Sequence, residues 1–248
     1  MGKKNRKKNK KVSANGKPIV SILTPTYNRR KFIPFLIRCV KDQTYPSQLI
    51  EWVVVDDGED CVEDLFKDIS GVKYIRLEKK MKLGAKRNFM MSQAKGEIFV
   101  YMDDDDYYPP DRVNDAVNKL RGRPQALAAG SSLVYLYFKH LKQIWSFGPY
   151  GQSHATAGTF ALKREILLHT RFNEEAEVAE EKEFLKNYTI PFVQLNPKKC
   201  ILVFAHQFNT FDKKKLIANG PTKYAKPTNL KVDFFIKDKE MRDFYINQ

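Results

Sequence analysis

The sequence predicts an α/β fold, in which a mostly parallel sheet is covered by helices, and three observations lead to this prediction. Strand and helix patterns alternate with short loops from Pro18 to about Leu120, the order that builds a parallel sheet with helices on both faces. With 248 residues, 42% hydrophobic and 12% aromatic, the chain can form one large domain and is not wholly disordered. Polar residues follow several of the expected strands directly.

The first half of the chain supplies four expected strands and three expected helices. Each strand is a short apolar run, rich in β-branched residues, that stops at a polar loop. These strands are expected at 19–24, 50–55, 72–77 and 98–102. Apolar residues at helical spacing predict helices over 32–40, 83–94 and 111–120. Gly96 is expected to end the second helix as a C-cap.

The pattern is less regular after residue 125. Strands are expected at 126–129, 133–138, 144–147, 192–195 and 201–205, with a helix at 179–187. The amphipathic stretch 232–245 predicts a docking helix. The expected organisation is a basic disordered tail over 1–16, a domain over 17–212 with halves of about 17–122 and 123–212, and an extension over 213–248.

Of the net charge of +15, seven positive charges lie among residues 1–11, and the remaining +8 is spread along the rest of the chain. Such a block is usually a disordered solvated tail, and contact of this tail with RNA or an anionic surface is the alternative. Membrane-spanning runs of about 18 apolar residues and a secretory signal are not found. Three scattered cysteines predict no disulfide framework, so the expected setting is cytoplasmic.

Ligands of parallel sheets bind beyond the carboxyl ends of the strands. Polar residues lie there at 26–28 and 56–57, and four aspartates follow the fourth expected strand at 103–106. Four adjacent carboxylates repel one another by the order of a few kcal/mol at intermediate dielectric. Mg²⁺ or Mn²⁺ would offset this repulsion, because these ions commonly bind one or two carboxylates plus substrate phosphates. A solvated acidic turn before Pro109 is the alternative.

Four ordered segments resemble the motifs of family 2 glycosyltransferases. They are Val20–Arg29, Val53–Gly58, Gly84–Asn88 and Met102–Asp106, within a resemblance that runs from about residue 18 to 210. The resemblance implies a GT-A fold, a single Rossmann-like domain with a mixed, mostly parallel central sheet flanked by helices. It also implies an inverting, hexosyltransferase-type enzyme with a DXD motif and Mn²⁺ or Mg²⁺. The expected donor is a nucleoside diphosphate sugar, UDP-sugar first, and the acceptor is a hydroxyl of a glycan, protein or lipid.

The resemblance assigns roles to the donor-side residues. Pro25, Thr26 and Tyr27 would contact the nucleotide, with Thr26 and Tyr27 flanking its base. Asp57 would pair with the base edge. Arg87 would face the diphosphate, since a guanidinium fork matches phosphate oxygens, or it would be an exposed helix charge.

Within the acidic run the resemblance implies different roles. Asp104 would lie near the ribose and diphosphate, and Asp105 would hold the metal. Asp103 matches the first acid of the commoner pattern, so either Asp103 or Asp104 meets the donor. Asp106 is expected to serve only the turn.

An inverting enzyme also needs a base for the acceptor hydroxyl. Glu181 matches that base in the stretch 179–185, although the family usually has Asp there. A one-residue shift to Glu180 or a plain acidic helix face are the alternatives. His206 resembles a late histidine that completes the metal shell or touches the diphosphate, or it is a hydrogen-bonded histidine at a strand end. Aromatic residues at 145, 147, 150 and 154 would line the acceptor side or belong to the core.

Two other functions are the alternatives. A nucleotidylyltransferase would need a glycine-rich, arginine-containing loop after the first strand, and residues 25–28 do not form one. A non-catalytic nucleic-acid-binding protein that uses the basic tail is supported by charge alone.

Overall fold

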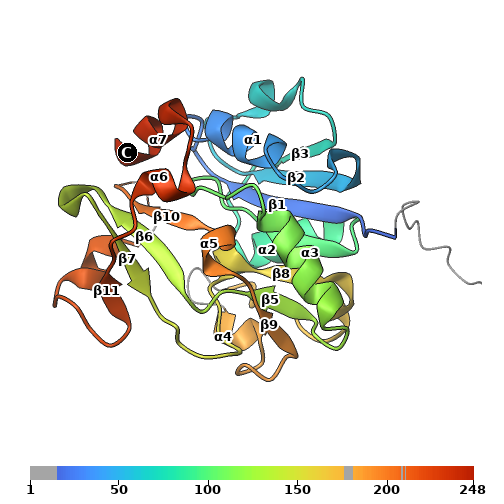
Figure 1. Ribbon diagram of the computed structural model, residues 1–248. Helices are drawn as coiled ribbons and strands as arrows, with labels where there is room; N and C mark the ends of the chain where they lie inside the picture. Colours follow the sequence, from blue (N-terminus) through green and yellow to red (C-terminus); the bar gives the residue numbers. More distant parts are fainter. Residues whose placement is uncertain (1–15, 176–180, 208, 210) are drawn as a thin grey trace, which may run out of the picture.

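A computed structural model of the chain (Figure 1) describes residues 16–175, 181–207, 209 and 211–248. The expected disordered tail over 1–16 lies outside the described residues, except for Gly16. Two sheets form the body of the molecule, one of seven strands and one of four.

The seven-stranded sheet has the order β3-β2-β1-β4-β8-β5-β9. Its strands are β1 (Val20–Thr26), β2 (Ile50–Asp56), β3 (Val72–Arg76), β4 (Ile98–Tyr101), β5 (Ala128–Gly130), β8 (Ala161–Lys163) and β9 (Phe192–Gln194). The first four in spatial order are parallel, whereas β8 is antiparallel to both of its neighbours. The expected mixed, mostly parallel sheet is therefore confirmed. Register places Thr26 opposite Asp56, so both strands end at the same edge.

Helices cover this sheet on both faces because successive strand residues alternate between them. Val20 and Ile22 of β1 share a buried cluster with α1 (Ile33–Lys41) and α3 (Arg112–Gly122). Leu23 belongs to a second cluster, with α2 (Leu83–Gln93) and the short helix α4 (Glu181–Phe184). The alternating strand and helix pattern of the first half thus gives the expected layers (Figure 1).

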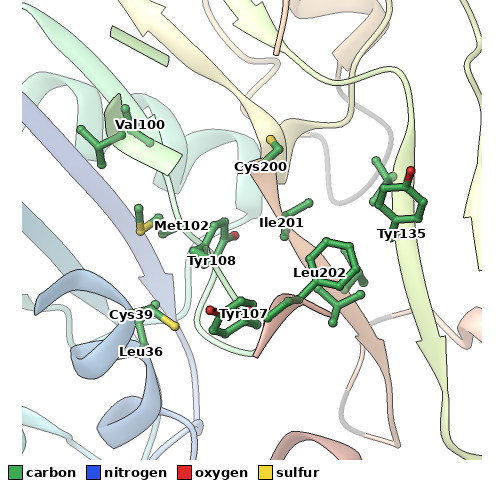
Figure 2. Close-up of a cluster of buried hydrophobic side chains, with 14 of the residues drawn as sticks. Leu36, Cys39, Val100, Met102, Tyr107, Tyr108, Tyr135, Cys200, Ile201 and Leu202 are labelled. Atoms are coloured by element: carbon green, nitrogen blue, oxygen red, sulfur yellow. Dashed lines mark hydrogen bonds between the residues drawn. The ribbon is translucent and has the colours of Figure 1, made fainter. Parts of the chain in front are cut away.

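The four-stranded sheet has the order β10-β6-β7-β11 and stands beside the large sheet (Figure 1). Its strands are β6 (Val134–Phe138), β7 (Gln143–Phe147), β10 (Leu202–Ala205) and β11 (Ala225–Pro227). Tyr107, in the loop after β4, forms an antiparallel bridge with Leu202 of β10, with backbone N···O distances of 3.1 and 2.9 Å. Figure 2 shows this bridge among buried side chains from β4, α1 and β10. The loop after β4 is therefore anchored to β10.

The expected helix over 232–245 is two helices, α6 (Val232–Phe235) and α7 (Lys239–Ile246). Asp238 starts the second helix as an N-cap, its Oδ1 accepting the Met241 N–H at 2.8 Å. Figure 1 shows α7 beside α1, where the rings of Phe35 and Phe244 stack with centroids 3.7 Å apart. The C-terminal segment is thus packed on the first helix of the chain.

Three further expectations differ from the structure. Within the described residues the helix expected over 179–187 covers 181–184, and Lys186, Asn187 and Tyr188 follow with left-handed φ values of 49°, 55° and 65°. Gly96 is not a left-handed C-cap; it packs against Ser21, where a Cβ would lie 2.5 Å from the backbone nitrogen. Strands β8 and β11 were not expected.

The remaining elements are short. They are α5 (Pro197–Cys200) and 3₁₀ turns at Ser47–Leu49, Glu63–Phe66, Lys139–Leu141, Ala157–Thr159, Arg164–Leu168 and Lys213–Ile217. In the part of the chain that the structure describes, no helix combines the length and apolar character needed to cross a membrane.

Candidate active site

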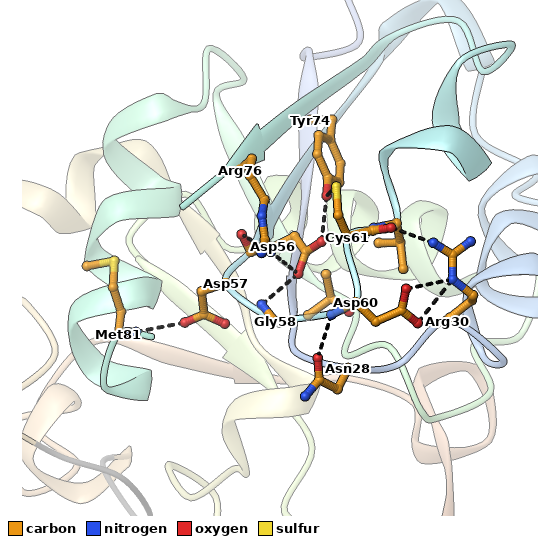
Figure 3. Close-up of polar contacts among 12 residues, drawn as sticks. Asn28, Arg30, Asp56, Asp57, Gly58, Asp60, Cys61, Tyr74, Arg76 and Met81 are labelled. Atoms are coloured by element: carbon orange, nitrogen blue, oxygen red, sulfur yellow. Dashed lines mark hydrogen bonds and ion pairs between the residues drawn. The ribbon is translucent and has the colours of Figure 1, made fainter. Parts of the chain in front are cut away.

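The loop after β2 is held in place by Asp56, the last residue of this strand, and is joined to the loop after β1 through Asn28 (Figure 3). Its Oδ1 accepts the Gly58 N–H at 2.9 Å and lies 3.3 Å from Arg76 Nη1, while its Oδ2 accepts the Val62 N–H at 3.2 Å. Asn28, with φ of 54°, accepts the Asp60 N–H. A Cβ on Gly58 would lie 2.5 Å from the Asn28 nitrogen, so these loops approach as closely as glycine allows.

Asp57 turns the other way, toward α2. Its side chain is fully buried, its Oδ2 accepts the Met81 N–H at 2.7 Å, and its Oδ1 pairs with Lys86 Nζ. Burial lowers the pKa of Lys86 although the Asp57 charge opposes this shift. The Asp57 carboxylate is therefore engaged on both oxygens and fixes the start of α2.

A cavity of about 800 Å³ opens at the carboxyl end of the large sheet. Its polar side is lined by Pro25, Thr26, Tyr27, Arg29, Lys80, Met81, Lys82, Leu83, Lys86, Arg87, Asp103, Asp104, Asp105, Asp106, Thr156 and Gly158. Its other side is lined mainly by apolar residues of the small sheet and its loops, which are Val134, Leu136, Phe147, Tyr150, Ile201, Val203, Asn209, Phe211, Lys213 and Leu216. The structure thus brings together seven of the predicted site residues: Pro25, Thr26, Tyr27, Arg87, Asp103, Asp104 and Asp105. In the described part of the chain, Asp57, Glu181 and His206 lie outside this lining.

The acidic run is shielded by an arginine from the loop after β1. Arg29 Nε lies 3.6 Å from Asp104 Oδ1, and Arg29 Nη2 lies 3.7 Å from Asp105 Oδ2. Burial, then the charge of Asp105, raise the pKa of Asp104 well above its usual value. Burial would also raise the pKa of Asp105, but the His206 hydrogen bond and the charges of Lys213 and Arg29 lower it to about 2. Asp105 is therefore a firmly ionised carboxylate.

Asp105 and His206, the two predicted metal ligands, are neighbours. His206 Nε2 lies 3.4 Å from Asp105 Oδ2, and Asn209 Nδ2 lies 3.3 Å from the same oxygen and 3.1 Å from His206 Nε2. Phe32 packs on the imidazole, with ring centroids 5.1 Å apart. The described residues contain no group of three His, Cys, Asp or Glu side chains placed to bind a metal. A pair of one carboxylate and one imidazole suits an ion that takes its other ligands from substrate phosphates and water.

Asp103 and Glu181 lie on either side of the turn Ala157–Thr159. A Cβ on Gly158 would lie 2.8 Å from Asp103 Oδ2, and the Ala157 N–H donates to Glu181 Oε1 at 2.9 Å. The buried guanidinium of Arg112 holds the turn from behind by donating to the carbonyls of residues 159 and 160 at 2.8 and 2.9 Å. Glu181 is thereby joined to a turn in which Gly158 lines the cavity. Glu180 lies outside the described residues.

Arg87 is 4% exposed, so the alternative of an exposed helix charge is wrong. Its guanidinium carbon lies 5.3 Å from the Tyr101 ring centroid and 5.4 Å from that of Phe172. These rings hold the cation at the cavity wall. Asp106 accepts the Phe204 N–H through Oδ1 at 3.1 Å, so it joins the turn to β10.

Sequence reasoning did not single out several polar residues of the cavity. Among them are Arg29, Lys80, Lys86, Asn209 and Lys213. Lys80 lies over the Tyr27 ring, with Nζ 4.2 Å from its centroid. Arg29 and Lys86 stand within the recognised motifs, which was a usable signal, whereas the loops that carry Lys80, Asn209 and Lys213 match no motif.

The aromatic candidates for the acceptor side divide into two groups. Phe147 and Tyr150 line the cavity, and His154 lies beside Tyr150 with ring centroids 4.9 Å apart. Trp145 is 6% exposed and packs against Phe138, so it belongs to the core and does not line the cavity.

Comparison with known proteins identifies a matching family and several similar proteins. The sequence model of the family described as glycosyl transferase family 2 matches residues 21–169. The chain is 30% identical over 129 residues to TuaG of Bacillus subtilis, named as a teichuronic acid biosynthesis glycosyltransferase, covering 48% of this chain and 49% of TuaG. It is 32% identical over 101 residues to the poly(ribitol-phosphate) β-N-acetylglucosaminyltransferase TarS of Staphylococcus aureus, covering 39% of this chain and 18% of TarS. The chain therefore spans at most about half the length of these relatives.

Solved structures show the same fold. TarS residues 1–349 in complex with UDP-GlcNAc superpose with a TM-score of 0.63 at 22% identity, covering 77% of this chain and 59% of that chain. The mannosyltransferase PcManGT of Pyrobaculum calidifontis, in complex with GDP-Man and Mn²⁺, gives a TM-score of 0.62 at 18% identity, covering 78% and 59%. These likenesses confirm the GT-A fold that the sequence predicts.

Proposed function

The chain belongs to glycosyl transferase family 2, and from that premise we propose that it transfers a sugar from a nucleoside diphosphate sugar to an acceptor hydroxyl. The observation that carries this proposal is the 800 Å³ cavity, in which the ionised Asp105 lies beside His206 and several cationic side chains. These charges suit a diphosphate and its metal ion. UDP-sugar is the proposed donor, and binding of UDP-GlcNAc by the structural neighbour TarS supports it.

On the donor side, Pro25, Thr26 and Tyr27 are proposed to receive the base, with Tyr27 already under Lys80. Arg87 is proposed to face the diphosphate. Asp57 would reach the base edge only by exchanging one of its present partners, Met81 N–H or Lys86, for the base.

The two candidates for the donor contact within the acidic run differ in their surroundings. Asp104 pairs with Arg29, whereas Asp103 abuts Gly158. We therefore propose that Asp104 meets the ribose and diphosphate. Asp103 is proposed to line the boundary between donor and acceptor.

The Asp105–His206 pair is proposed to hold Mn²⁺ or Mg²⁺, which when bound would stabilise the negative charge of the leaving diphosphate. Asn209 touches both side chains and is proposed to orient them.

Glu181 is proposed to take the proton of the acceptor hydroxyl in an inverting reaction. Its Oε1 is held by the Ala157 N–H, and its second oxygen would receive the proton. The acceptor is proposed to be a hydroxyl of a glycan, protein or lipid. The free thiols Cys39, Cys61 and Cys200 agree with the cytoplasmic setting that we propose for the reaction.

A thermal-shift screen with nucleoside diphosphates, their sugars and Mn²⁺ tests donor and metal together. A ligand at a hundredfold excess over its dissociation constant should stabilise the folded state by about 2.7 kcal/mol. For a chain of this size the melting temperature should rise by about 5–10 °C. Addition of EDTA, or the Asp105→Asn change, should remove most of this rise. The exposed Asp68 supplies a matched control, Asp68→Asn, which should respond like the wild type. An undiminished metal-dependent rise in Asp105→Asn would show that the metal is held elsewhere.

The Glu181→Gln variant separates donor binding from transfer. It should keep the nucleotide-dependent rise in melting temperature but lose about 10²–10⁴-fold in the rate of transfer, since general bases contribute that range. The rate is measured as nucleoside diphosphate released in the presence of an acceptor. Glu183→Gln, which alters an exposed glutamate on the same helix, is the control. Equal rates for Glu181→Gln and wild type would place the base at another residue, with Glu180 the next candidate.

A further inference from the structure

Four aromatic side chains form a continuous row beside the apolar side of the cavity. We call Tyr224, Tyr150, His154 and Tyr188, in this order, the aromatic row. Successive ring centroids are 5.2, 4.9 and 5.4 Å apart. Tyr150 and His154 come from the loop after β7, Tyr188 follows α4, and Tyr224 precedes β11. The row therefore brings together three segments that are distant in the sequence.

The outer end of the row faces solvent. Tyr150 is 44% exposed and Tyr224 is 40% exposed, and Tyr150 also lines the cavity. Adjacent exposed aromatic side chains at the mouth of a cavity are a common feature of binding sites. The exposed tyrosines are thus accessible to a ligand that also enters the cavity.

Hydrogen bonds to backbone carbonyls hold the row in place. Gln194 Nε2 donates to the carbonyls of residues 152 and 154 at 2.8 and 2.9 Å. The Gly148 N–H donates to the Tyr224 carbonyl at 2.8 Å, which ties the two outer tyrosine segments together. Tyr188 is the last of three successive left-handed residues. Because these segments are fixed, little conformational entropy would be lost when a ligand binds.

The inner end of the row lies near the proposed base. Tyr188, at this end of the row, follows α4, whose first residue is Glu181. Burial lowers the pKa of His154, and the charge of Glu181 opposes this shift. Glu181 accepts the Ala157 N–H, and the neighbouring residues Thr156 and Gly158 line the cavity. A molecule lying along the row would therefore extend from solvent to the edge of the reaction site.

We propose that the aromatic row is the acceptor subsite and that the acceptor is a saccharide chain, whose sugar rings stack on Tyr150 and Tyr224 with the reacting hydroxyl toward Glu181. This inference rests on the proposed function. Tyrosine rings offer large, rigid contact area at low entropy cost, and their faces complement the C–H faces of sugar rings. A chain of rings fits a row of rings better than an acyclic polyol would.

Binding of oligosaccharides tests the proposal. The probes are trisaccharides of glucose, N-acetylglucosamine, galactose and mannose, with poly(ribitol phosphate) as an acyclic polyanion, each measured by saturation-transfer NMR with UDP and Mn²⁺ present. At least one trisaccharide should bind, and Tyr150→Ala and Tyr224→Ala should each weaken its binding about three- to tenfold. Tyr150→Phe keeps the ring and should bind as the wild type does. Phe234→Ala is the matched control, because Phe234 is a 45% exposed aromatic on α6 outside the row.

Three outcomes would overturn the inference. They are equal trisaccharide binding by wild type and Tyr150→Ala, binding of none of the trisaccharides, and binding of poly(ribitol phosphate) alone. The last result would show that the acceptor is bound by electrostatic attraction to the lysines near Tyr224 and Leu216.

Circular dichroism of every variant verifies that the fold is retained. The rise in melting temperature with UDP and Mn²⁺ is recorded on the same samples. If that rise is present without trisaccharide binding, the inference fails and the proposed function stands; if the rise is absent as well, the proposed function fails.

Discussion

At the scale of single residues, the four adjacent aspartates differ because each has different neighbours. His206, Lys213 and Arg29 keep the pKa of Asp105 at about 2. Burial raises the pKa of Asp104 and of Asp106 well above the usual value. The run therefore combines one firmly ionised carboxylate with two whose ionisation is opposed by burial and by neighbouring charge. A cation bound at Asp105 would relieve the repulsion that the other two experience.

The buried pair of Lys86 and Asp57 leads to a stability prediction. Lys86→Met should lower the free energy of unfolding by about 3–5 kcal/mol, because it leaves the Asp57 charge buried without its cation. Asp57→Asn should also destabilise, although its amide oxygen can still accept the Met81 N–H. Urea unfolding of both single variants and the double variant measures the coupling. The double variant should lose less stability than the two single losses combined; strict additivity would show that the pair contributes nothing as a pair.

At the scale of elements, the strands that the sequence predicts well are those that lie in an apolar run. β1 and β2, with seven residues each, lie within one or two residues of their expected bounds. β5 and β9 have three residues each but overlap the apolar runs expected at 126–129 and 192–195. β8 and β11 are equally short and are interrupted or ended by Lys163, Lys226 and Pro227, so they display no strand pattern. The expected single C-terminal helix is divided because Asp238 caps a new helix, and its capping role depends on the chain path at 236–238.

Sequence patterns also predict only part of the candidate site. Residues that directly follow a strand could be placed in one region, since parallel strands end at the same edge of a sheet, and Asp103, Asp104 and Asp105 do line the cavity. Arg29 follows a strand too, but its contact with Asp104 depends on how two loops fold over each other. Asn209 and Lys213 reach the site only because the small sheet packs there. Tertiary packing, which the sequence pattern does not encode locally, decides these contacts.

The turn Ala157–Thr159 leads to a prediction for an element. Gly158→Ala would place a Cβ 2.8 Å from Asp103 Oδ2, the end of a side chain that can move aside. The melting temperature should therefore fall only slightly, while transfer should decrease about tenfold or more, because a displacement of about 1 Å in an active site can cost as much as a hundredfold in rate. Gly122→Ala is the control, since no heavy atom lies within 4 Å of its added Cβ. Wild-type transfer by Gly158→Ala would show that the position of Asp103 does not matter to the reaction.

At the scale of the whole molecule, the C-terminal segment closes the structure around the loop after β4. Tyr245 of α7 is buried, its hydroxyl donates to the Asp106 carbonyl at 3.0 Å, and its ring stacks on Phe204 of β10. The Tyr107 hydroxyl donates to the Phe235 carbonyl of α6, also at 3.0 Å. β11 pairs with β7 in the small sheet. These contacts connect residues after 212 to the loop that carries the acidic run.

A pair of truncations tests how far the molecule depends on this segment. A chain of residues 16–212 lacks five large buried apolar side chains, which are Val232, Phe235, Ile236, Met241 and Tyr245. Full burial of such side chains contributes about 1.5–3 kcal/mol each, so their loss approaches the total stability of about 5–15 kcal/mol that domains commonly have. We therefore expect 16–212 to show no cooperative thermal transition by circular dichroism, whereas 16–248 should melt like the full chain. A cooperative transition of 16–212 near the full-length melting temperature would instead support the separable extension over 213–248 that the sequence predicts. In that case the fold would not require the contacts that α7 makes.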